Sequence, residues 1–391
     1  MNKSLETHRQ NFPALENKAY FNYGGQGPLP QVSMDKIIKS YQFVQECGPF
    51  SQKVNSWVQQ ELGLTREAIA SELGVPSATI TLTEDVTVGC NIALWGIDWQ
   101  RGDHLLISDC EHPGVVATVG ELVRRFQIEV SVCPLLETLN EGDPVEAIAS
   151  RIKSNTRLVV ISHILWNTGQ VLPLTAIMQA CKAASGGVRV LVDAAQSVGV
   201  LPLNLGESGV DFYGFTGHKW LCGPEGLGGL YVSPDAVSDL SPTFIGWRGI
   251  EVDERGTPTN WKSDGRRYEI ATSAYPLMVG LREAIAIHNQ WGTATERYQQ
   301  ICNLSQYLWE RLSELPQIDC LRTSPPESGL VSFKVTQSLP HPQIVRALES
   351  ENILVRTILD PDCIRACVHY FTQRSEIDEL ISCLAKISGG G

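Results

Sequence analysis

The sequence predicts an α/β protein with a large domain on a mainly parallel sheet and a smaller α+β domain towards its C-terminal end. Between about residues 60 and 235, short apolar runs alternate with segments of helical periodicity, which is typical of parallel strands joined by crossover helices. The character of the chain changes after a stretch rich in glycine, proline and charge. With 391 residues, the chain is long enough for two such domains.

Four apolar runs bounded by turn residues are the predicted strands of the large domain. They cover residues 104–108, 157–163, 188–195 and 228–233. Segments 146–152 and 175–184 carry apolar residues at helical spacing, so we expect crossover helices there. Residues 234–266 are predicted to form long loops, and loops of that length in a compact enzyme usually carry function.

The C-terminal part of the chain predicts a second, smaller core. The predicted helices cover 276–291, 301–315, 343–351 and 377–384, and the predicted strands cover 328–335, 353–357 and the region near 366–370. We therefore divide the chain into an N-terminal segment that packs on the small domain (1–18), the large domain (19–265) and the small domain (266–391).

Charge and composition argue against several classes of partner. The sequence has 31 Lys and Arg against 43 Asp and Glu, a formal net charge of −12. Such an acidic chain is a poor ligand for phosphate backbones and anionic lipids, so we expect neither nucleic acid nor a membrane as partner. The N-terminus lacks the apolar segment of a secretory signal, and no stretch reaches the roughly 20 apolar residues of a membrane span, which favours a cytoplasmic location. The 11 cysteines include no CxxC pair, and we expect no metal site.

Lys219 is the first candidate for chemistry. It follows an apolar stretch and stands between glycine-rich turns. Desolvation there would lower the pKa of its amine and make it a nucleophile towards an aldehyde, so Lys219 is a candidate Schiff-base residue. A lone lysine in a loop is more often a surface residue, so this reading needs a second element.

Asp193 is that second element. It closes a predicted buried strand 26 residues before Lys219, where an open α/β sheet presents groups to a ligand at the carboxyl ends of its strands. A carboxylate in that place suits a pyridinium nitrogen, which it keeps protonated. The alternative is an aspartate that caps the following helix.

Three short motifs together resemble the class V, fold-type I enzymes that depend on pyridoxal 5'-phosphate (PLP), a family that includes cysteine desulfurases, isopenicillin epimerases and C–S lyases. The motifs are Asp193-Ala-Ala-Gln196, Thr216-Gly217-His218-Lys219 and Gly223-Pro224-Glu225-Gly226. The resemblance implies the fold-type I, PLP-dependent transferase-like fold over nearly the whole chain. It also implies PLP as cofactor, with Lys219 as its attachment point and Asp193 and Gln196 as ring contacts.

Further matches supply the other cofactor contacts. The resemblance implies that Val86 and Thr87, at a helix N-terminus, hold the phosphate with help from Thr216 and His218. His112, in the segment Glu111-His112-Pro113, is then the imidazole that stacks on the cofactor ring.

The segment from Arg267 to Thr272 matches a family segment whose threonine reaches the phosphate of the neighbouring subunit. This match implies a homodimer in which Thr272 contributes to the site of the partner.

Two features depart from the family pattern. Trp166, followed by Asn167, stands where the family commonly has an asparagine, and we assign a role to neither. Desulfurases place a mobile nucleophilic cysteine five residues beyond the arginine that matches Arg356, but this chain has Pro361 there and Cys363 two positions later.

Arg356 and Arg365 are the predicted substrate-binding residues, because each can clamp a carboxylate through paired N–H donors. The family arginine at the position of Arg365 binds the substrate α-carboxylate. Either arginine could instead be a surface residue or part of a structural ion pair.

The resemblance implies a carbon–sulfur lyase. Lys219 would remove the Cα proton, with His112 as the other catalytic residue, and β-elimination would convert cystine, and more slowly cysteine, to pyruvate, ammonia and cysteine persulfide or sulfide. Such a lyase could feed iron–sulfur cluster assembly, with an apo iron–sulfur protein as sulfur acceptor.

The main alternative is a cysteine desulfurase with Cys363 as persulfide carrier, followed by an aminotransferase or epimerase of the same family. A cofactor-free binding protein is disfavoured by the intact set of predicted cofactor contacts. A nicotinamide oxidoreductase is disfavoured because no GxGxxG follows the first predicted strand.

Overall fold

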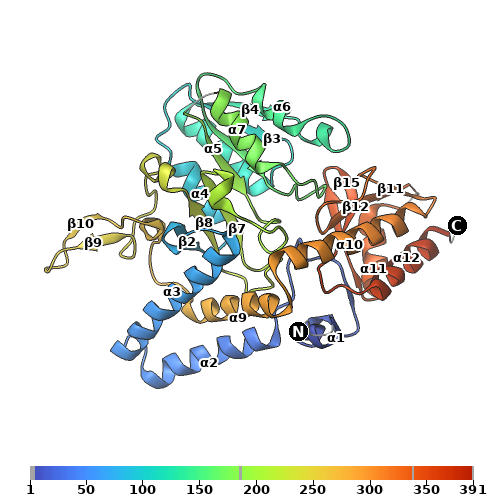
Figure 1. Cartoon of the computed structure of the whole chain (residues 1–391), viewed down its shortest axis with the longest axis horizontal. Helices are drawn as coiled ribbons and strands as arrows, with labels where there is room; N and C mark the ends of the chain where they lie inside the picture. Colours follow the sequence, from blue (N-terminus) through green and yellow to red (C-terminus); the bar gives the residue numbers. More distant parts are fainter. Residues whose placement is uncertain (1–4, 185–186, 337–338, 390–391) are drawn as a thin grey trace.

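A seven-stranded, mainly parallel sheet forms the centre of the molecule, as predicted (Figure 1). The computed structural model describes residues 5–184, 187–336 and 339–389. The strand order is β2-β8-β7-β6-β5-β3-β4, and β8 alone runs in the direction opposite to the other strands. The strands are β2 (Ile80–Thr83), β3 (His104–Ser108), β4 (Glu129–Cys133), β5 (Thr156–Ser162), β6 (Arg189–Asp193), β7 (Phe212–Thr216) and β8 (Gly228–Val232).

The predicted strands of this sheet are confirmed because their apolar runs are buried on both faces. Every residue of β3 and β8 is buried, since helices cover the sheet on each side and leave two apolar cores. The helices of this part are α2 (Gln31–Cys47), α3 (Gln52–Leu73), α4 (Val86–Gly96), α5 (Pro113–Phe126), α6 (Pro144–Ala149), α7 (Leu174–Ala184) and α8 (Leu205–Ser208).

A second sheet of four antiparallel strands builds the C-terminal core, in the order β11-β12-β15-β14. Its strands are β11 (Ile318–Cys320), β12 (Leu330–Val335), β14 (Arg356–Leu359) and β15 (Asp362–Cys367), and its helices are α10 (Ala294–Ser313), α11 (His341–Ser350) and α12 (Arg374–Gly389).

The single strand predicted at 353–357 is two strands in the structure. The first piece, β13 (Ile353–Leu354), pairs in parallel with β1 (Ala19–Tyr20), and the second piece is β14 of the four-stranded sheet. The chain changes sheets at Val355, and the segment Ile-Leu-Val-Arg-Thr contains no glycine or proline that would signal such a switch.

The N-terminal helix α1 (Leu5–Arg9) lies against the C-terminal part of the chain. Arg9 forms an ion pair with Glu376 of α12, with Nη2 and Oε1 2.9 Å apart. Helix α9 (Tyr275–Trp291) instead contacts α2 and α3 (Figure 1). The domain division at residues 18, 265 and 266 stays a prediction.

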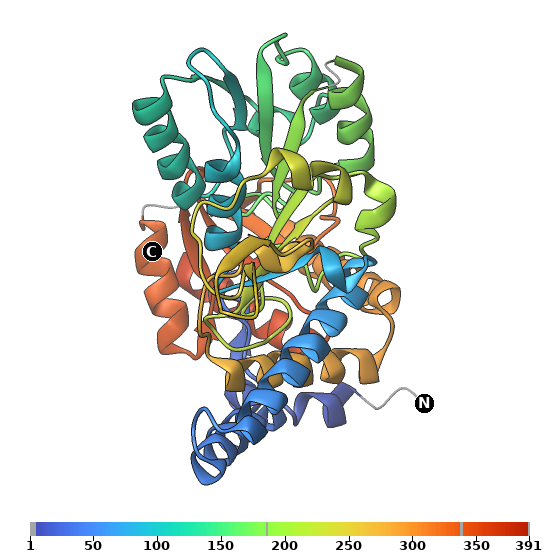
Figure 2. The same cartoon turned by 90° about the vertical axis from the view of Figure 1, so that its left-hand side faces the viewer.

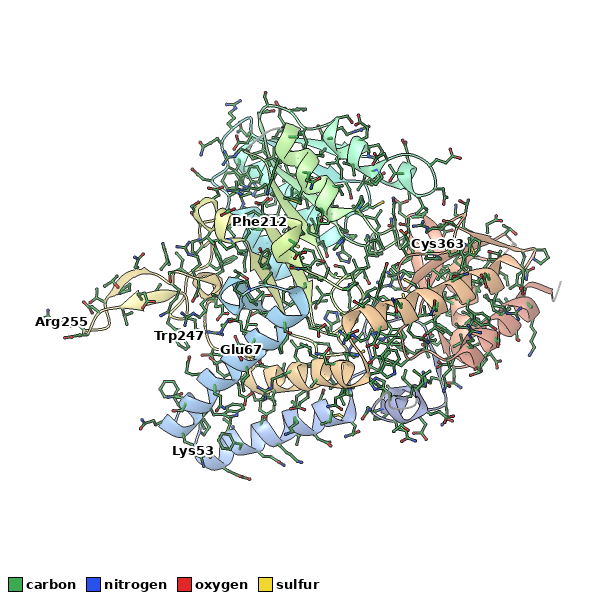
Figure 3. The ribbon with its side chains drawn as sticks, in the orientation of Figure 1. Lys53, Glu67, Phe212, Trp247, Arg255 and Cys363 are labelled. Carbon is green, nitrogen blue, oxygen red and sulfur yellow. The ribbon has the colours of Figure 1, made fainter. Side chains whose placement is uncertain are left out.

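The region expected to be long loops contains short regular elements. It holds a hairpin of β9 (Ile250–Val252) and β10 (Pro258–Trp261), which projects from the body with Arg255 at its tip (Figures 1 and 3). The view in Figure 2 looks onto this hairpin face. The hairpin strands are only three and four residues long and are largely exposed, so they are too short to show the periodicity that reveals buried strands.

Two short 3-10 turns flank this hairpin, at Pro234–Asp239 and Gly265–Tyr268.

Among the described residues, we find no helix with the length and apolar character needed to cross a bilayer.

Candidate active site

A cavity of about 240 Å³ lies at the carboxyl ends of the parallel strands. Ser162 ends β5, Asp193 ends β6, and Lys219 follows β7 by three residues, so the sheet order brings the three together. The cavity lining includes eight of the predicted site residues: Val86, Thr87, His112, Asp193, Gln196, His218, Lys219 and Arg356. Three others, Thr216, Thr272 and Arg365, do not line it.

Lys219 has the altered basicity that its predicted role requires. Burial lowers the pKa of its amine to about 8, although the carboxylate of Asp193 acts in the opposite direction. About a tenth of Lys219 is therefore an uncharged, nucleophilic amine at pH 7, far more than for a lysine with the reference pKa of about 10.4.

Hydrogen bonds to neighbouring residues fix the side chains of Asp193 and Gln196 in the cavity wall. An Asp193 oxygen accepts the N–H of Ala195 at 2.9 Å, and burial raises the pKa of the carboxyl group while this hydrogen bond and Lys219 lower it. The amide of Gln196 donates to the carbonyl of Gly24 at 2.9 Å and accepts the indole N–H of Trp220 at 2.8 Å. Both residues are thus fixed before any ligand binds.

The N-terminus of α4 supplies an anion-binding position. The Asp85 side chain caps the helix by accepting the N–H of Val88 at 2.9 Å, and Val86 and Thr87 lie at the cavity wall. Thr216 lies close by, with its hydroxyl 2.7 Å from Nδ1 of His218. Free N–H groups and hydroxyls at a helix N-terminus suit a phosphate.

His112 lines the cavity. Burial and then Lys219 lower the pKa of its imidazole, so the ring is neutral near pH 7. Its Nδ1 accepts the N–H of Gly114 at 3.2 Å, and its ring meets Trp166 edge to face at 5.6 Å. Trp166, to which the sequence assigned no role, is therefore part of the cavity wall.

Glu111 is a buried residue that the sequence did not single out for a site role. Its carboxyl group accepts hydrogen bonds from Ser108 at 2.5 Å and from the backbone N–H and hydroxyl of Ser162, both at 2.8 Å. Burial raises its pKa to about 8. It ties the ends of β3 and β5 together directly behind His112.

Two arginines concentrate positive charge beside the cavity. Arg356 and Arg365 are paired across β14 and β15, and burial together with the charge of Arg365 lowers the pKa of Arg356. Arg365 is 1% exposed, and one of its N–H groups donates to the carbonyl of Trp166 at 2.5 Å. Its Nε and Nη2 have no hydrogen-bond partner among the described residues. This arrangement suits an incoming carboxylate.

Cys363 is not among the residues that line this cavity. It is 0% exposed within β15, and burial raises the pKa of its thiol to about 12. Figure 3 shows it inside the C-terminal part of the molecule.

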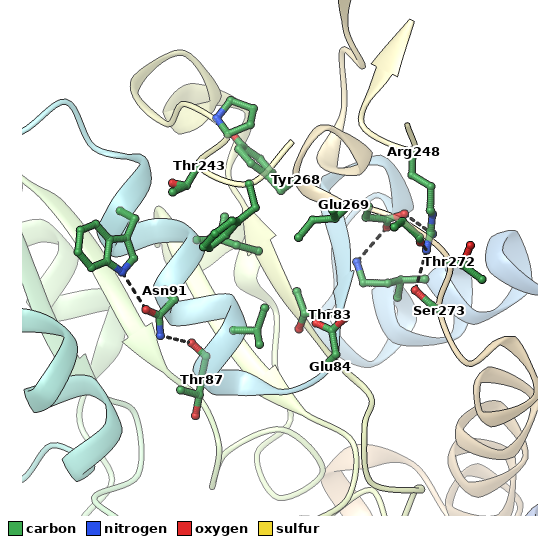
Figure 4. A pocket seen from close by; sticks show the side chains of 18 of the residues that line it. Thr83, Glu84, Thr87, Asn91, Thr243, Arg248, Tyr268, Glu269, Thr272 and Ser273 are labelled. Carbon is green, nitrogen blue, oxygen red and sulfur yellow. Dashed lines mark hydrogen bonds and ion pairs between the residues drawn. The ribbon is translucent and has the colours of Figure 1, made fainter. Parts of the chain in front are cut away.

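Thr272 lines a different, larger cavity of about 660 Å³ (Figure 4). Thr87 borders both cavities, and Arg248 donates to Ser273 at 2.9 Å on the same wall as Thr272. Within one chain, Thr272 therefore does not join the residues around Lys219.

Comparison with known proteins agrees with this arrangement. The model of the aminotransferase class-V family matches residues 19–380. The isopenicillin N epimerase of Streptomyces clavuligerus is 25% identical over 384 residues, 94% of each chain. A probable cysteine desulfurase of Methanothermobacter thermautotrophicus is 26% identical over 408 residues, 99% of this chain and 98% of the relative.

Solved structures of C-DES, described as a cystine C–S lyase, are also similar. The complex of C-DES with its reaction product cysteine persulfide is 50% identical, with a TM-score of 0.94 over 96% of this chain and 99% of the other. A lysine-to-alanine mutant of C-DES, with glycine covalently linked to the PLP cofactor, is also 50% identical in sequence. Its TM-score is 0.95, over 96% of this chain and 98% of the other. The family predicted from the motifs is thus confirmed, and the chain belongs to the aminotransferase class-V family.

Proposed function

We propose that this protein is a PLP-dependent carbon–sulfur lyase that performs β-elimination on cystine, and more slowly on cysteine. The observation that carries the proposal is a lysine of lowered pKa in a cavity flanked by two arginines, with Cys363 buried elsewhere. The similarity to C-DES in complex with cysteine persulfide supports the same substrate class.

The residues of the cavity fit PLP. The N-terminus of α4 with Thr87, together with the pair Thr216–His218, supplies donors for a phosphate, and Asp193 supplies a buried carboxylate for a pyridinium nitrogen. Lys219 supplies the amine, and His112 supplies a flat ring in the cavity wall. When bound, PLP supplies an aldehyde for the amine and a ring that accepts the electron pair released at the substrate Cα.

The residues of the protein have two roles towards the substrate: binding its carboxylates and removing its Cα proton. Arg365 binds the α-carboxylate with its two unpartnered N–H groups, and Arg356 binds the second carboxylate of cystine. Lys219 Nζ, uncharged in part near neutral pH, takes the Cα proton as general base. The overall balance is cystine plus water to pyruvate, ammonia and cysteine persulfide.

Leaving-group chemistry favours cystine over cysteine. A plain thiol has a reference pKa of about 8.5 and leaves less readily than the more acidic persulfide that cystine releases. A β-elimination also needs no protein nucleophile. A desulfurase, in contrast, needs a mobile thiolate, and Cys363 is a strand residue whose thiol pKa is raised.

We expect the Cys363→Ser variant to keep cystine turnover within about twofold of the wild type, because the side chain lies outside the cavity. The measurement is the rate of pyruvate formation, with alanine quantified in parallel. A loss of activity, together with alanine from cysteine and a persulfide trapped on Cys363, would overturn the lyase and establish the desulfurase.

We also propose a homodimer with shared active sites. The cavity that contains Thr272 lies beside the exposed side chains of Phe244, Ile245 and Trp247, which are 63%, 58% and 59% exposed. Apolar side chains gathered at one face are typical of an interface.

The homodimer predicts complementation between two defective chains. Lys219→Ala and Thr272→Ala protomers are each expected to be inactive alone. Mixing them should restore up to about a quarter of the wild-type activity, because about half of the dimers are hybrids and each hybrid contains one intact site of two. The mass in solution, from light scattering, is the second measurement. A monomer with full cofactor occupancy contradicts the shared site.

A cytoplasmic location and an apo iron–sulfur protein as sulfur acceptor belong to the same proposal. The acceptor is supported by the resemblance to cysteine desulfurases. Transfer of persulfide sulfur from the reaction mixture to an apo ferredoxin, followed by its visible spectrum, tests the acceptor.

A further inference from the structure

Five successive backbone carbonyls around Lys219 each accept a hydrogen bond. The donors are Gly223 N for Gly217 (2.9 Å), Gly27 N for His218 (2.7 Å), Cys222 N for Lys219 (3.0 Å), His369 Nε2 for Trp220 (3.0 Å) and His288 Nε2 for Leu221 (3.0 Å). The two imidazoles come from positions 149 and 67 residues away, one after β15 and the other on α9. The segment that carries Lys219 is therefore held from several parts of the fold.

The protonation of both imidazoles is defined by their surroundings. His369 is 0% exposed and His288 is 2% exposed, and burial lowers the pKa of His369 to about 3 and that of His288 well below its usual range. Each ring is neutral and carries one N–H. Nδ1 of His369 accepts the backbone N–H of Tyr370 at 3.0 Å, and Nδ1 of His288 lies 2.8 Å from the Tyr370 hydroxyl. Both N–H groups consequently sit on Nε2 and donate to the carbonyls of Trp220 and Leu221.

A metal is a poor alternative for this cluster. The ligand atoms of Cys222, His288 and His369 lie within 4.8 Å of one another, a spacing that a metal ion could use. A bound ion would need imidazole lone pairs that already accept hydrogen bonds, and it would need a thiolate although burial raises the pKa of the Cys222 thiol.

The backbone near Lys219 has little room to move. A Cβ at Gly27 would lie 2.1 Å from the carbonyl oxygen of Lys219, and a Cβ at Gly199 would lie 2.8 Å from the carbonyl carbon of Trp220. The indole of Trp220 is itself bound to Gln196 at the cavity wall. A change in these peptide units therefore displaces Lys219 and the ring contact Gln196 together.

We propose that His369 and His288 are positioning residues for Lys219: their N–H groups fix the two peptide units that follow it and so hold its amine in the cavity with Asp193. The network extends to the N-terminal helix, since the Tyr370 hydroxyl lies 2.7 Å from Nε2 of His8. This inference rests on the proposed function, in which Lys219 binds PLP.

The test compares leucine and glutamine at both positions. Leucine removes the donor, whereas the glutamine amide reaches about as far as Nε2 and restores it. His104→Leu is the matched control. His104 is as buried as His369, and both of its ring nitrogens form hydrogen bonds, to Thr156 and Ser131. It stands at the first residue of β3, at the end of the strand that is remote from the cavity. Each protein is loaded with PLP, and the pH midpoint of its visible absorption band is measured beside its thermal unfolding.

We expect His369→Leu and His288→Leu to shift the midpoint by about one pH unit, a tenfold change in the protonation equilibrium. The glutamine variants should return to within about 0.3 units, a twofold change, and His104→Leu should lower the unfolding temperature without moving the midpoint. Leucine variants that match the control, or glutamine variants that restore nothing, would overturn the positioning role.

Two further measurements keep the outcome clear. If a leucine variant does not fold, His369→Asn replaces it, because its shorter amide withdraws the donor while remaining polar; an unchanged midpoint then counts against the inference. Borohydride reduction and peptide mapping of the wild type distinguish a failure of the proposed function from a failure of the positioning role. No PLP label on Lys219 overturns the proposed function, whereas a normal label with unshifted variants overturns the positioning role alone.

Discussion

We expect the Lys219→Ala variant to lose cystine turnover by at least about 10³-fold, because one amine acts both as covalent anchor and as general base. The same change should remove the visible absorption band of protein-bound PLP. Steady-state pyruvate formation and the absorption spectrum are the measurements. The prediction follows from the position of Lys219 beside Asp193 and from its pKa of about 8.

Lys153→Ala is the matched control for this change. Lys153 is an exposed lysine that pairs with Glu129 at 3.4 Å, and such surface pairs contribute little to stability. It should therefore retain full activity and normal cofactor uptake. A borohydride label on a lysine other than Lys219 would contradict the assignment of the anchor.

We expect Arg365→Ala to lower kcat/KM by about 10² to 10³-fold for both cystine and cysteine. Removing one partner of a buried, hydrogen-bonded charge pair costs about 2 to 5 kcal/mol, and the α-carboxylate is common to both substrates. Arg356→Ala should lower kcat/KM for cystine by about tenfold and leave cysteine nearly unchanged, because only cystine carries the second carboxylate.

Arg365→Lys separates charge from geometry in this experiment. Lysine keeps the positive charge but lacks the planar fork of paired donors, so we expect partial rescue of the alanine variant. Equal losses on cystine and cysteine in Arg356→Ala would contradict the assignment of that arginine to the second carboxylate.

The two arginines also show why this site is built for an anion. They lie on neighbouring strands, and burial together with the positive charge of Arg365 lowers the pKa of Arg356. Arg365 donates one hydrogen bond to the carbonyl of Trp166, and this bond orients its guanidinium. Its Nε and Nη2 have no hydrogen-bond partner among the described residues. A bound carboxylate would relieve both the repulsion and the unmet donors.

The sequence by itself predicted four of the seven strands of the central sheet and the family of the protein. The runs that form β3, β5, β6 and β8 are recognisable because parallel strands buried on both faces are almost wholly apolar. Asp193 and Lys219 are recognisable because each follows such a run and belongs to a short, specific motif. Local pattern therefore sufficed for the family and for the residues at the strand ends.

The tertiary structure alone decided features that depend on distant segments. The break at Val355 follows from pairing with β1 more than 300 residues earlier, and the hairpin after β8 has no buried face that could mark its strands. Burial of Cys363 became visible only once β15 was placed in its sheet.

The histidines behind Lys219 are the clearest case of this kind. Neither His288 nor His369 stands near Lys219 in the sequence or belongs to a recognisable motif. Their role depends on the direction of single N–H groups towards the carbonyls of Trp220 and Leu221, and that direction is set by the packing of α9 and of the loop after β15. Hydrogen bonds between such distant residues follow from how the elements pack, so no local sequence pattern can encode them.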